Sequence, residues 1–319
     1  MKKVISILTC LCLLITTGCS RQETIRFGAA GVGGMYYPFA NAFTELASKD
    51  ETGINWKVKS TAGSAANLRL LSDNYIELGI AQADLIEDAY YGKGSFHSGK
   101  YRGYKAVASL YPEACQIVVR KDSDITSLDD LEGKNVSVGE EESGTERNAT
   151  QILEMCGLPD NLVNTKNLDY TDAADQLAEK KIDAFFCTAG ICTTVIEELT
   201  KECDIRLLEI PESCRQKLKK AYSFYDDYVI PAGTYSGQTE DIQTISVQSV
   251  LLASSTLSEK TVQKLTASLF KHIKDIQYSI SINLQLTPQE AVKGITIPFH
   301  PGAEAYYRLE GVELPEVES

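Results

Sequence analysis

Small and hydroxyl-bearing residues gather at four turns, each of which precedes a predicted helix. Turns of this kind leave backbone N–H groups free at a helix N-terminus, and their hydroxyl groups add further hydrogen-bond donors. Any one of them is ordinary, because Gly and Ser are common before helices. Four at regular positions predict a site that binds an anion or a polar oxygen rather than one that breaks bonds. The turns are Gly33-Gly34, Gly63-Ser64, Ser143-Gly144-Thr145 and Thr188-Ala189-Gly190.

A repeated order of strand, polar turn and helix places these turns. A short strand over Thr24–Ala29 leads into an amphipathic helix within Val32–Lys49, where Tyr36, Phe39 and Phe43 recur at helical spacing. Tyr36 either lines the pocket or packs in the core. The strand over Ile76–Ala81 is followed by Gln82 and another helix. The order predicts an α/β fold with a mostly parallel sheet flanked by helices, in which Gln82 and the four turns lie at the carboxyl edge.

The chain is predicted to cross between two lobes. Two β-rich runs, Lys105–Leu110 and Cys115–Arg120, are joined by a short turn at Tyr111-Pro112, and Ile230–Gly233 would carry the chain back. No low-complexity linker interrupts the sequence, so crossing strands rather than a flexible tether are expected to join the lobes. The predicted units are lobe I over residues 24–112 and 233–319, and lobe II over residues 113–232.

The first residues resemble an export signal. Lys2 and Lys3 precede the apolar run Val4–Ile15, and small residues then lead to Cys19. We expect a lipoprotein signal peptide over 1–18, a diacylated Cys19 that anchors the protein to the membrane outside the cytoplasm, and a linker over 19–23. The alternative is ordinary signal peptidase cleavage with an incidental Cys19, because Thr16 stands where lipoboxes usually carry Leu.

Charge and residue types exclude several partners. The formal net charge is −13, and −15 without Lys2 and Lys3, which argues against nucleic acid as a partner. There is no Cys-x-x-Cys pair and the three His residues are scattered, so neither a metal nor a cofactor is expected.

Six cysteines remain after the predicted processing. In an exported protein they could form disulfides, and Cys203 with Cys214 is the favoured pair. They could equally stay free, because a core of this size needs no covalent link and a buried thiol packs as a small apolar group. The six are Cys115, Cys156, Cys187, Cys192, Cys203 and Cys214.

Seven segments, in this order and spacing, resemble the TAXI family, the substrate-binding subunits of tripartite ATP-independent periplasmic (TRAP) transporters. The resemblance covers nearly the whole mature chain. The segments are Gly33-Gly34-Met35-Tyr36-Tyr37-Pro38, Gly63-Ser64-Ala65-Ala66-Asn67-Leu68, Gly79-Ile80-Ala81-Gln82-Ala83-Asp84, Leu128-Asp129-Asp130-Leu131-Glu132-Gly133-Lys134, Ser143-Gly144-Thr145, Gly233-Thr234-Tyr235 and His300-Pro301-Gly302-Ala303.

The resemblance implies a two-lobed periplasmic-binding-protein fold of type II. It implies a monomer that captures a small acid such as glutamate, glutamine or 2-oxoglutarate and delivers it to a membrane permease driven by an ion gradient. Together with the turns, it gives the candidate ligand-binding residues Gly33, Gly34, Met35, Tyr36, Ser64, Asn67, Gln82, Ser143, Gly144, Thr145, Thr188 and Gly190.

Two departures from the family pattern bear on the ligand. Met35 replaces a threonine of the first turn, so a hydroxyl donor is lost and a flexible thioether is gained. Glu140-Glu141-Glu142 stands where the family has glycine before Ser-Gly-Thr. These carboxylates would repel a dicarboxylate if they faced the cleft, and would have little effect if solvated at its rim, which is the favoured interpretation.

Other charged residues have structural explanations. Arg69 and Arg147 could each hold a carboxylate, but surface pairing with a nearby acid is favoured. His300 is expected to fix a loop rather than to act in catalysis.

Two other functions are weighed against transport. An exported enzyme is disfavoured, because the chain has no Gly-x-Ser-x-Gly elbow and no His-Glu-x-x-His. A receptor that instructs a membrane sensor would share the same fold, and the sequence does not separate it from a transport receptor.

Overall fold

The computed structural model describes residues 23–50, 53–159, 161–280 and 286–317. The predicted signal peptide and Cys19 therefore lie outside the described residues. Within the described part, no helix combines the length and the apolar character needed to span a membrane.

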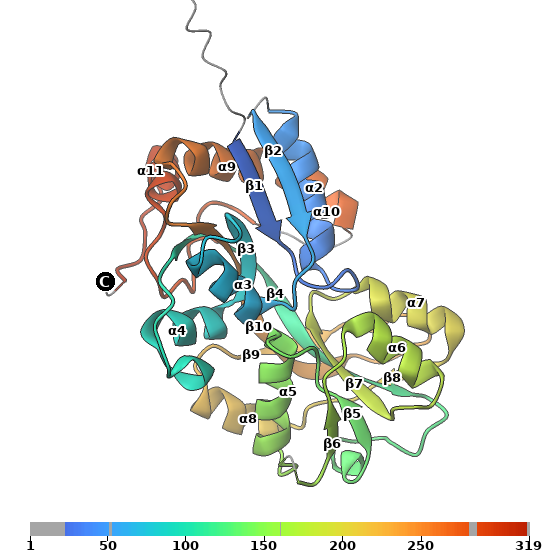
Figure 1. Cartoon of the computed structure of the whole chain (residues 1–319). Coiled ribbons are helices and arrows are strands. Elements are labelled where there is room, and N and C mark those ends of the chain that lie inside the picture. Colours follow the sequence, from blue (N-terminus) through green and yellow to red (C-terminus); the bar gives the residue numbers. More distant parts are fainter. Residues whose placement is uncertain (1–22, 51–52, 160, 281–285, 318–319) are drawn as a thin grey trace, which may run out of the picture.

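Strands and helices alternate along most of the chain (Figure 1). The strands are β1 (Glu23–Gly28), β2 (Ile54–Lys59), β3 (Leu78–Gln82), β4 (Tyr104–Arg120), β5 (Asn135–Ser137), β6 (Asn164–Lys166), β7 (Ala184–Ala189), β8 (Ile205–Leu207), β9 (Asp226–Ile230) and β10 (Ile242–Ser254). The helices are α2 (Tyr36–Ser48), α3 (Ser64–Ser72), α4 (Ala83–Tyr91), α5 (Gly144–Met155), α6 (Tyr170–Ala178), α7 (Thr194–Glu202), α8 (Glu212–Ala221), α9 (Glu259–Lys271), α10 (Ile273–Ile280) and α11 (Pro301–Leu309), with short 3-10 turns at Gly94–Phe96 and Asp129–Leu131.

The strands of the described residues form one mixed sheet in the order β2-β1-β3-β10-β4-β7-β5-β6, with β8 beside β4 and β9 beside β10. Both ends of the sheet are parallel: β1 pairs with β2 and β3, and β5 pairs with β6 and β7. The middle is antiparallel, because β10 pairs with β3, β4 and β9, and β4 with β7 and β8. The strand-turn-helix order of the sequence therefore predicts the parallel ends of the sheet. It does not predict the antiparallel strands in the middle.

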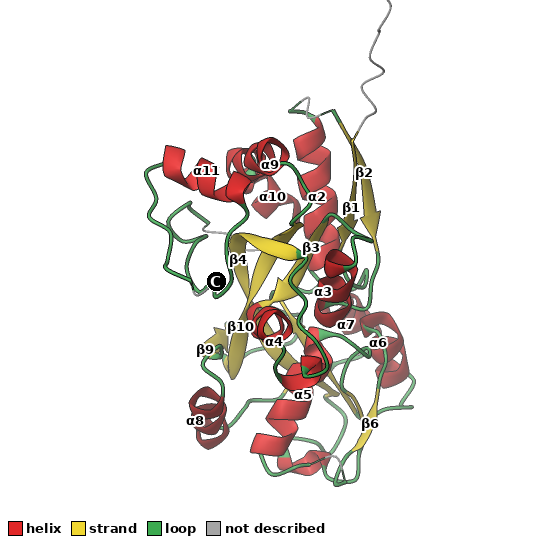
Figure 2. Cartoon of the chain, turned by 60° about the vertical axis from the view of Figure 1, so that its left-hand side comes forward, coloured by secondary structure: helices red, strands yellow, loops and turns green. Residues whose placement is uncertain are grey.

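Two long strands, β4 and β10, join the two ends of the molecule, as expected of crossing strands (Figures 1 and 2). The short turn predicted at Tyr111-Pro112 is wrong, because β4 runs without interruption through both predicted β-rich runs. Pro112 is opposite Gln248, next to a shift in the β4–β10 register. Proline removes a ladder hydrogen bond, and an irregularity of the ladder is where a sheet tolerates it.

Two hydrophobic cores pack against the sheet, and only the second is confined to one side of this crossing. The first includes Phe27, Phe39 and Leu252, and the second includes Val136 and Ile152. In Figure 2, α9, α10 and α11 lie at the end of the sheet that carries β1 and β2, and α5 and α8 lie at the other end. The first core also continues past the crossing to Leu177 of α6 and Ile196 of α7, so the two ends of the sheet and the long strands between them, rather than separate cores, give the molecule its two lobes.

The boundaries of the lobes stay a prediction. Ile245 and Val247 pack in the second core, and residues 242–246 pair with β9. These contacts favour a return crossing near Gln248 rather than at Gly233, whereas the outward crossing at Pro112 agrees with its place in the middle of β4.

The described cysteines are free, and the favoured pairing of Cys203 with Cys214 is wrong. Cys203 follows α7 and packs against the first core, whereas Cys214 belongs to α8 and the second core. The thiol of Cys214 instead lies in hydrogen-bonding contact with that of Cys156. Closeness in the sequence therefore does not indicate which thiols meet in space.

Candidate ligand-binding cleft

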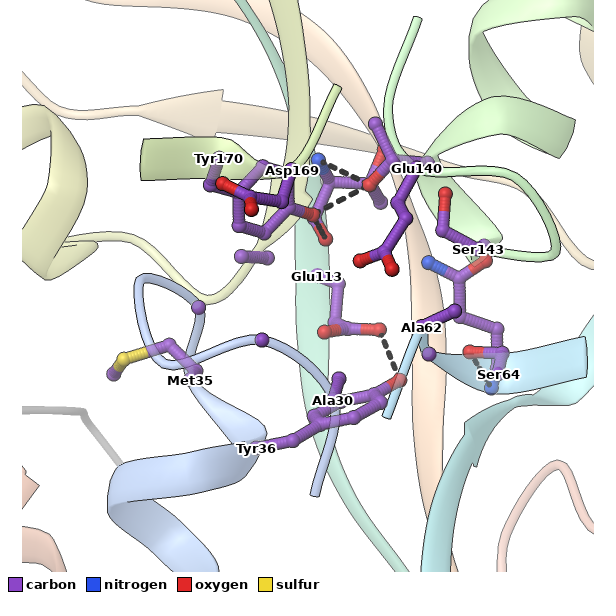
Figure 3. A pocket seen from close by; sticks show the side chains of 18 residues that line it. Ala30, Met35, Tyr36, Ala62, Ser64, Glu113, Glu140, Ser143, Asp169 and Tyr170 are labelled. Atoms are coloured by element: carbon purple, nitrogen blue, oxygen red, sulfur yellow. Dashed lines mark hydrogen bonds between the residues drawn. The ribbon is translucent and has the colours of Figure 1, made fainter. Parts of the chain in front are cut away.

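A cavity lies between the two lobes, with about 510 Å³ of empty space, part of it open to solvent. It is lined by turns that follow β1, β2, β5 and β6, by the last residues of β3 and β7, and by the middle of β4. Figure 3 shows that side chains from both lobes converge on this space. The strand ends that the sequence singles out therefore meet at one crevice.

Nine of the twelve predicted ligand-binding residues line this cavity, although their role in binding stays a prediction. They are Gly34, Met35, Tyr36, Ser64, Gln82, Ser143, Gly144, Thr145 and Thr188.

Three predicted residues lie outside the lining. Asn67 is fully buried and donates to the carbonyl oxygens of Gly28 (3.3 Å) and Ile80 (2.9 Å), so it ties α3 to the sheet. Gly190 accepts a hydrogen bond from the Thr193 hydroxyl (2.6 Å). Gly33 accepts one from the Val195 amide (3.4 Å), beside the cleft.

The floor of the cavity is a buried carboxyl group, Glu113 in β4. Its side chain is 2% exposed, and Tyr36 donates its hydroxyl proton to Glu113 Oε2 over 2.7 Å. Burial raises the pKa of Glu113 to about 8, against the hydrogen bonds from Tyr36 and Gln82, which lower it. Burial and the charge of Glu113 hold the pKa of Tyr36 well above its ordinary value, so this hydroxyl is a donor.

One wall is fixed by hydrogen bonds within lobe II. The hydroxyls of Thr145 and Tyr170 lie 2.5 Å apart, Tyr170 donates to the Thr188 carbonyl (3.0 Å), and the Thr188 amide donates to Thr145 Oγ1 (3.2 Å). These bonds tie α5, α6 and β7 together and leave the ring of Tyr170 packed against Gly34 of lobe I. The hydroxyls of Thr145 and Tyr170 are thus largely committed to the protein.

Met35 stands where the TAXI family has a threonine, but its thioether does not point toward the cavity floor. It is 2% exposed, packs in the first core and points away from Glu113 (Figure 3). Only helix-terminal backbone remains to present donors at this turn.

The N-terminus of α5 offers donors to the cavity. Ser143 caps the helix by accepting a hydrogen bond from the Glu146 amide (3.0 Å), and the first-turn amides of α5 have no partner within the helix. The N-terminus of α3 differs, because the Ala65 and Ala66 amides donate to the Glu142 carbonyl across the cleft (3.1 and 3.4 Å). The Glu142 carbonyl oxygen of lobe II therefore occupies the predicted anion site at the N-terminus of α3.

Glycines allow the lobes this close approach. A Cβ atom on Gly144 would lie 2.2 Å from Gln82 Oε1, and one on Gly63 would lie 3.3 Å from the Ser143 Cα. Gly63 also has a φ of 128°, which residues with a side chain rarely adopt. At both positions the opposite lobe takes the place of a side chain.

The three consecutive glutamates behave differently from one another. Glu140 is half-buried and turns its carboxyl group into the cavity (Figure 3), whereas Glu141 is exposed. Glu142 pairs with Arg69. Interpreting the whole run as a solvated rim is therefore wrong for Glu140, whose pKa is raised by burial and by the nearby charge of Asp169.

The two predicted arginines pair with acids, as favoured, and both pairs cross the cleft. Arg69 of α3 lies 3.0 Å from Glu142, and Arg147 of α5 lies 2.7 Å from Asp88 of α4. His300 caps α11 by accepting a hydrogen bond from the Gly302 amide (3.1 Å), as expected of a residue that fixes a loop.

Several lining residues are not among the predicted ligand-binding residues. Glu113 had a usable signal, because it is the single acidic residue in the apolar run from Ala106 to Val119. Asp169 caps α6 directly before Tyr170, a turn of the same kind as the other four. The residues missed or undervalued are Ala30, Gly31, Ala62, Gly63, Glu113, Glu140, Asp169, Tyr170 and Ala189.

Comparison with known proteins agrees with this architecture. The model of the NMT1-like family matches residues 27–311. A putative L-cystine ABC transporter protein from Listeria monocytogenes is 15% identical with a TM-score of 0.52, over 81% of this chain and 94% of that chain. A Bordetella bronchiseptica protein is 17% identical with a TM-score of 0.55, over 90% of this chain and 80% of that chain.

A binding-protein component of an ABC phosphonate transporter from Pseudomonas aeruginosa is 13% identical with a TM-score of 0.50, over 82% of this chain and 80% of that chain. At such identities the likeness shows the fold alone. The predicted fold class, an α/β two-lobed architecture of the type II periplasmic-binding-protein kind, is confirmed.

Proposed function

This chain belongs to the NMT1-like family, and from that premise we propose that it is an extracytoplasmic solute-binding protein. It captures a small polar metabolite between its lobes and delivers it to a membrane permease. The observation that carries the proposal is the cavity between the lobes, because helix N-termini and polar side chains from both lobes surround it. A ligand held there would favour the closed arrangement of the lobes, which a permease can recognise.

The finer parts of the proposal rest on the resemblance in sequence. We propose a TRAP-type permease as the partner, a monomeric protein, and anchorage through a lipid on Cys19. The proposed ligand is a small carboxylate of the glutamate, glutamine or 2-oxoglutarate kind. The free amides at the α5 N-terminus support a carboxylate group, since such a terminus favours negative charge.

Binding rather than catalysis is proposed for the hydroxyl groups in the cleft. The Ser143 hydroxyl caps α5, and Ser64 Oγ accepts a hydrogen bond from the backbone N–H group of Gln82 (3.1 Å). The titratable neighbour of Ser64 is Tyr36. Its raised pKa makes it a poor base, and its proton is directed to Glu113, so Tyr36 does not activate Ser64 as a nucleophile.

Thermal unfolding in the presence of a panel of metabolites tests the proposal. A ligand at one hundred times its dissociation constant stabilises the folded state by about 2.7 kcal/mol, which raises the melting temperature by several degrees. We expect at least one compound to do so.

A variant that fills the cavity provides the control. Ala62 lines the cavity, whereas Ala232 is exposed in the loop after β9. We expect Ala62→Trp to lose the stabilisation and Ala232→Trp to keep it. A panel without any stabilising compound, or a shift that survives Ala62→Trp, would contradict binding in this cleft.

A further inference from the structure

Three carboxyl groups line the cavity, and no cation stands among the described lining residues. Glu113 lies on the floor, Glu140 is half-buried on the side, and Asp169 is exposed at the mouth. Figure 3 shows the carboxyl groups of Glu113 and Glu140 turned toward the same space. Among the described residues, no Lys, Arg or His lines the cavity.

The two arginines that reach across the cleft are already engaged. Arg69 is paired with Glu142, and Arg147 is paired with Asp88. Both pairs hold the rim, so neither guanidinium neutralises the carboxyl groups inside. A negative ligand would therefore meet Glu140 and Asp169 and a protonated Glu113, with no lining cation among the described residues to compensate its charge, which costs free energy.

An unsatisfied oxygen in the same lining points to a ligand donor. Gln82 is 2% exposed and lines the cavity, and its Oε1 atom has no hydrogen-bond partner among the described residues. The other end of this amide interacts with the Glu113 carboxyl. A buried acceptor without a donor is costly, and a ligand N–H group would satisfy it.

We propose that the cleft selects a solute that bears a protonated amine, which Glu113, Glu140 and the free oxygen of Gln82 hold, and that it rejects dicarboxylates without an amine, so that glutamate and glutamine stay in the class and 2-oxoglutarate leaves it. This inference rests on the proposed function and deepens it by naming the ligand class. The α5 N-terminus can still accept a carboxylate at the other end of the solute, so both amines and zwitterionic amino acids belong to the class.

The pKa values of the cleft agree with this selection. Burial and nearby acids raise the pKa of Glu113 to about 8 and raise that of Glu140, and no cation among the described lining residues opposes this, so Glu113 holds a proton at neutral pH that it releases when an ammonium group binds. A ligand ammonium supplies the missing cation and makes a charge-assisted hydrogen bond, the stronger kind.

The experiment compares five-carbon probes of matched length within the metabolite panel: 1,5-diaminopentane, 5-aminopentanoate and glutarate. Calorimetry gives the dissociation constants, and thermal unfolding screens the remaining amines, amino acids and dicarboxylates. We expect every stabilising compound to carry an amine and the best of them to bind at least tenfold more tightly than glutarate. Binding confined to compounds without an amine would overturn the inference and leave the proposed function standing. Absence of any binding would overturn both.

Isosteric variants assign the effect to the carboxyl groups. We expect Glu113→Gln to weaken the best amine at least a hundredfold and Glu140→Gln about tenfold, with Glu141→Gln, the exposed neighbour, as the matched control. Circular dichroism checks that each variant is folded, and Glu140→Gln decides the matter if Glu113→Gln is not. Unchanged affinity for the amine in a folded Glu113→Gln or Glu140→Gln would overturn the inference.

Discussion

The rim and the floor of the cleft treat charge in opposite ways. At the rim, an arginine of one lobe pairs with an acidic residue of the other, in the pairs Arg69–Glu142 and Arg147–Asp88. On the floor, Glu113 is nearly inaccessible and is surrounded by neutral donors and by the further acid Asp84. The rim pairs are partly exposed, so solvent weakens them, whereas Glu113 lies in a poorly hydrated space.

This difference separates two tasks. Paired charges at the rim can guide and hold closure without a ligand, because they satisfy one another. The unpaired carboxyl of Glu113 is satisfied only by a proton, by water in an open cleft, or by a ligand cation. We therefore expect changes on the floor to have larger effects than changes at the rim.

The largest expected effect is the pH dependence of the unliganded protein. The pKa of Glu113 is raised to about 8 and that of Asp84 to about 7, both by burial. Their folded-state pKa values exceed the unfolded ones, so the folded state binds more protons between about pH 4 and pH 8. The free energy of unfolding should therefore fall as pH rises through this window, by about 4 kcal/mol for Glu113.

Glu113→Gln tests the origin of this slope. Denaturant unfolding from pH 5 to pH 8 should show a distinctly flatter pH dependence for the variant than for the unchanged chain. Tyr36, Tyr111 and Cys115 face the same space, but their pKa values are raised and they stay neutral in this window. An equally steep slope in Glu113→Gln would mean that the floor is hydrated and that its contrast with the rim is absent.

The next largest effect is expected at Gly144, where the N-terminus of α5 in lobe II meets Gln82 of lobe I. Gly144→Ala would place a Cβ atom 2.2 Å from Gln82 Oε1, so Gln82 must move or the lobes must stay apart. Overpacking of this kind costs about 1–3 kcal/mol, which predicts a ligand affinity roughly tenfold to a hundredfold weaker. Calorimetry measures the affinity, and small-angle scattering measures whether the liganded variant closes.

Gly99→Ala is the matched control, because no atom lies within 4 Å of the added Cβ and the backbone has no left-handed φ. It should bind as the unchanged chain does. If Gly144→Ala binds equally well and closes, the lobes do not meet at this contact in the liganded protein.

Local periodicity predicts much of the fold, since the strand expected over 24–29 is found at Glu23–Gly28 and the helix within 32–49 at Tyr36–Ser48. It fails where a partner elsewhere in the chain decides. Pro112 indicates a turn locally, yet β10 supplies an irregular register that accommodates it within β4. Cys203 and Cys214 are close in sequence, but they pack in different cores.

The candidate site divides in the same way. The turns before helices are local patterns, so the sequence predicts Ser64, Ser143 and Gly144 as lining residues. Asn67 lies in the helix that follows one of those turns, yet it donates to two backbone carbonyls that only the folded sheet brings near. Glu113 becomes a floor residue because both lobes close over β4, which no local pattern contains.

The smallest expected effect is at the rim, where Arg147→Gln removes one of the two pairs. The pair is partly exposed, with side-chain exposures of 27% for Arg147 and 14% for Asp88, so its loss should cost about 1 kcal/mol of closure. We expect a threefold to tenfold weaker affinity, with a smaller loss at high salt because ions already screen the pair. Lys180→Gln removes an exposed pair with Asp122 that lies within lobe II, and should change the affinity less than twofold. An Arg147→Gln protein that binds as tightly as Lys180→Gln at low salt would show that the rim does not assist closure.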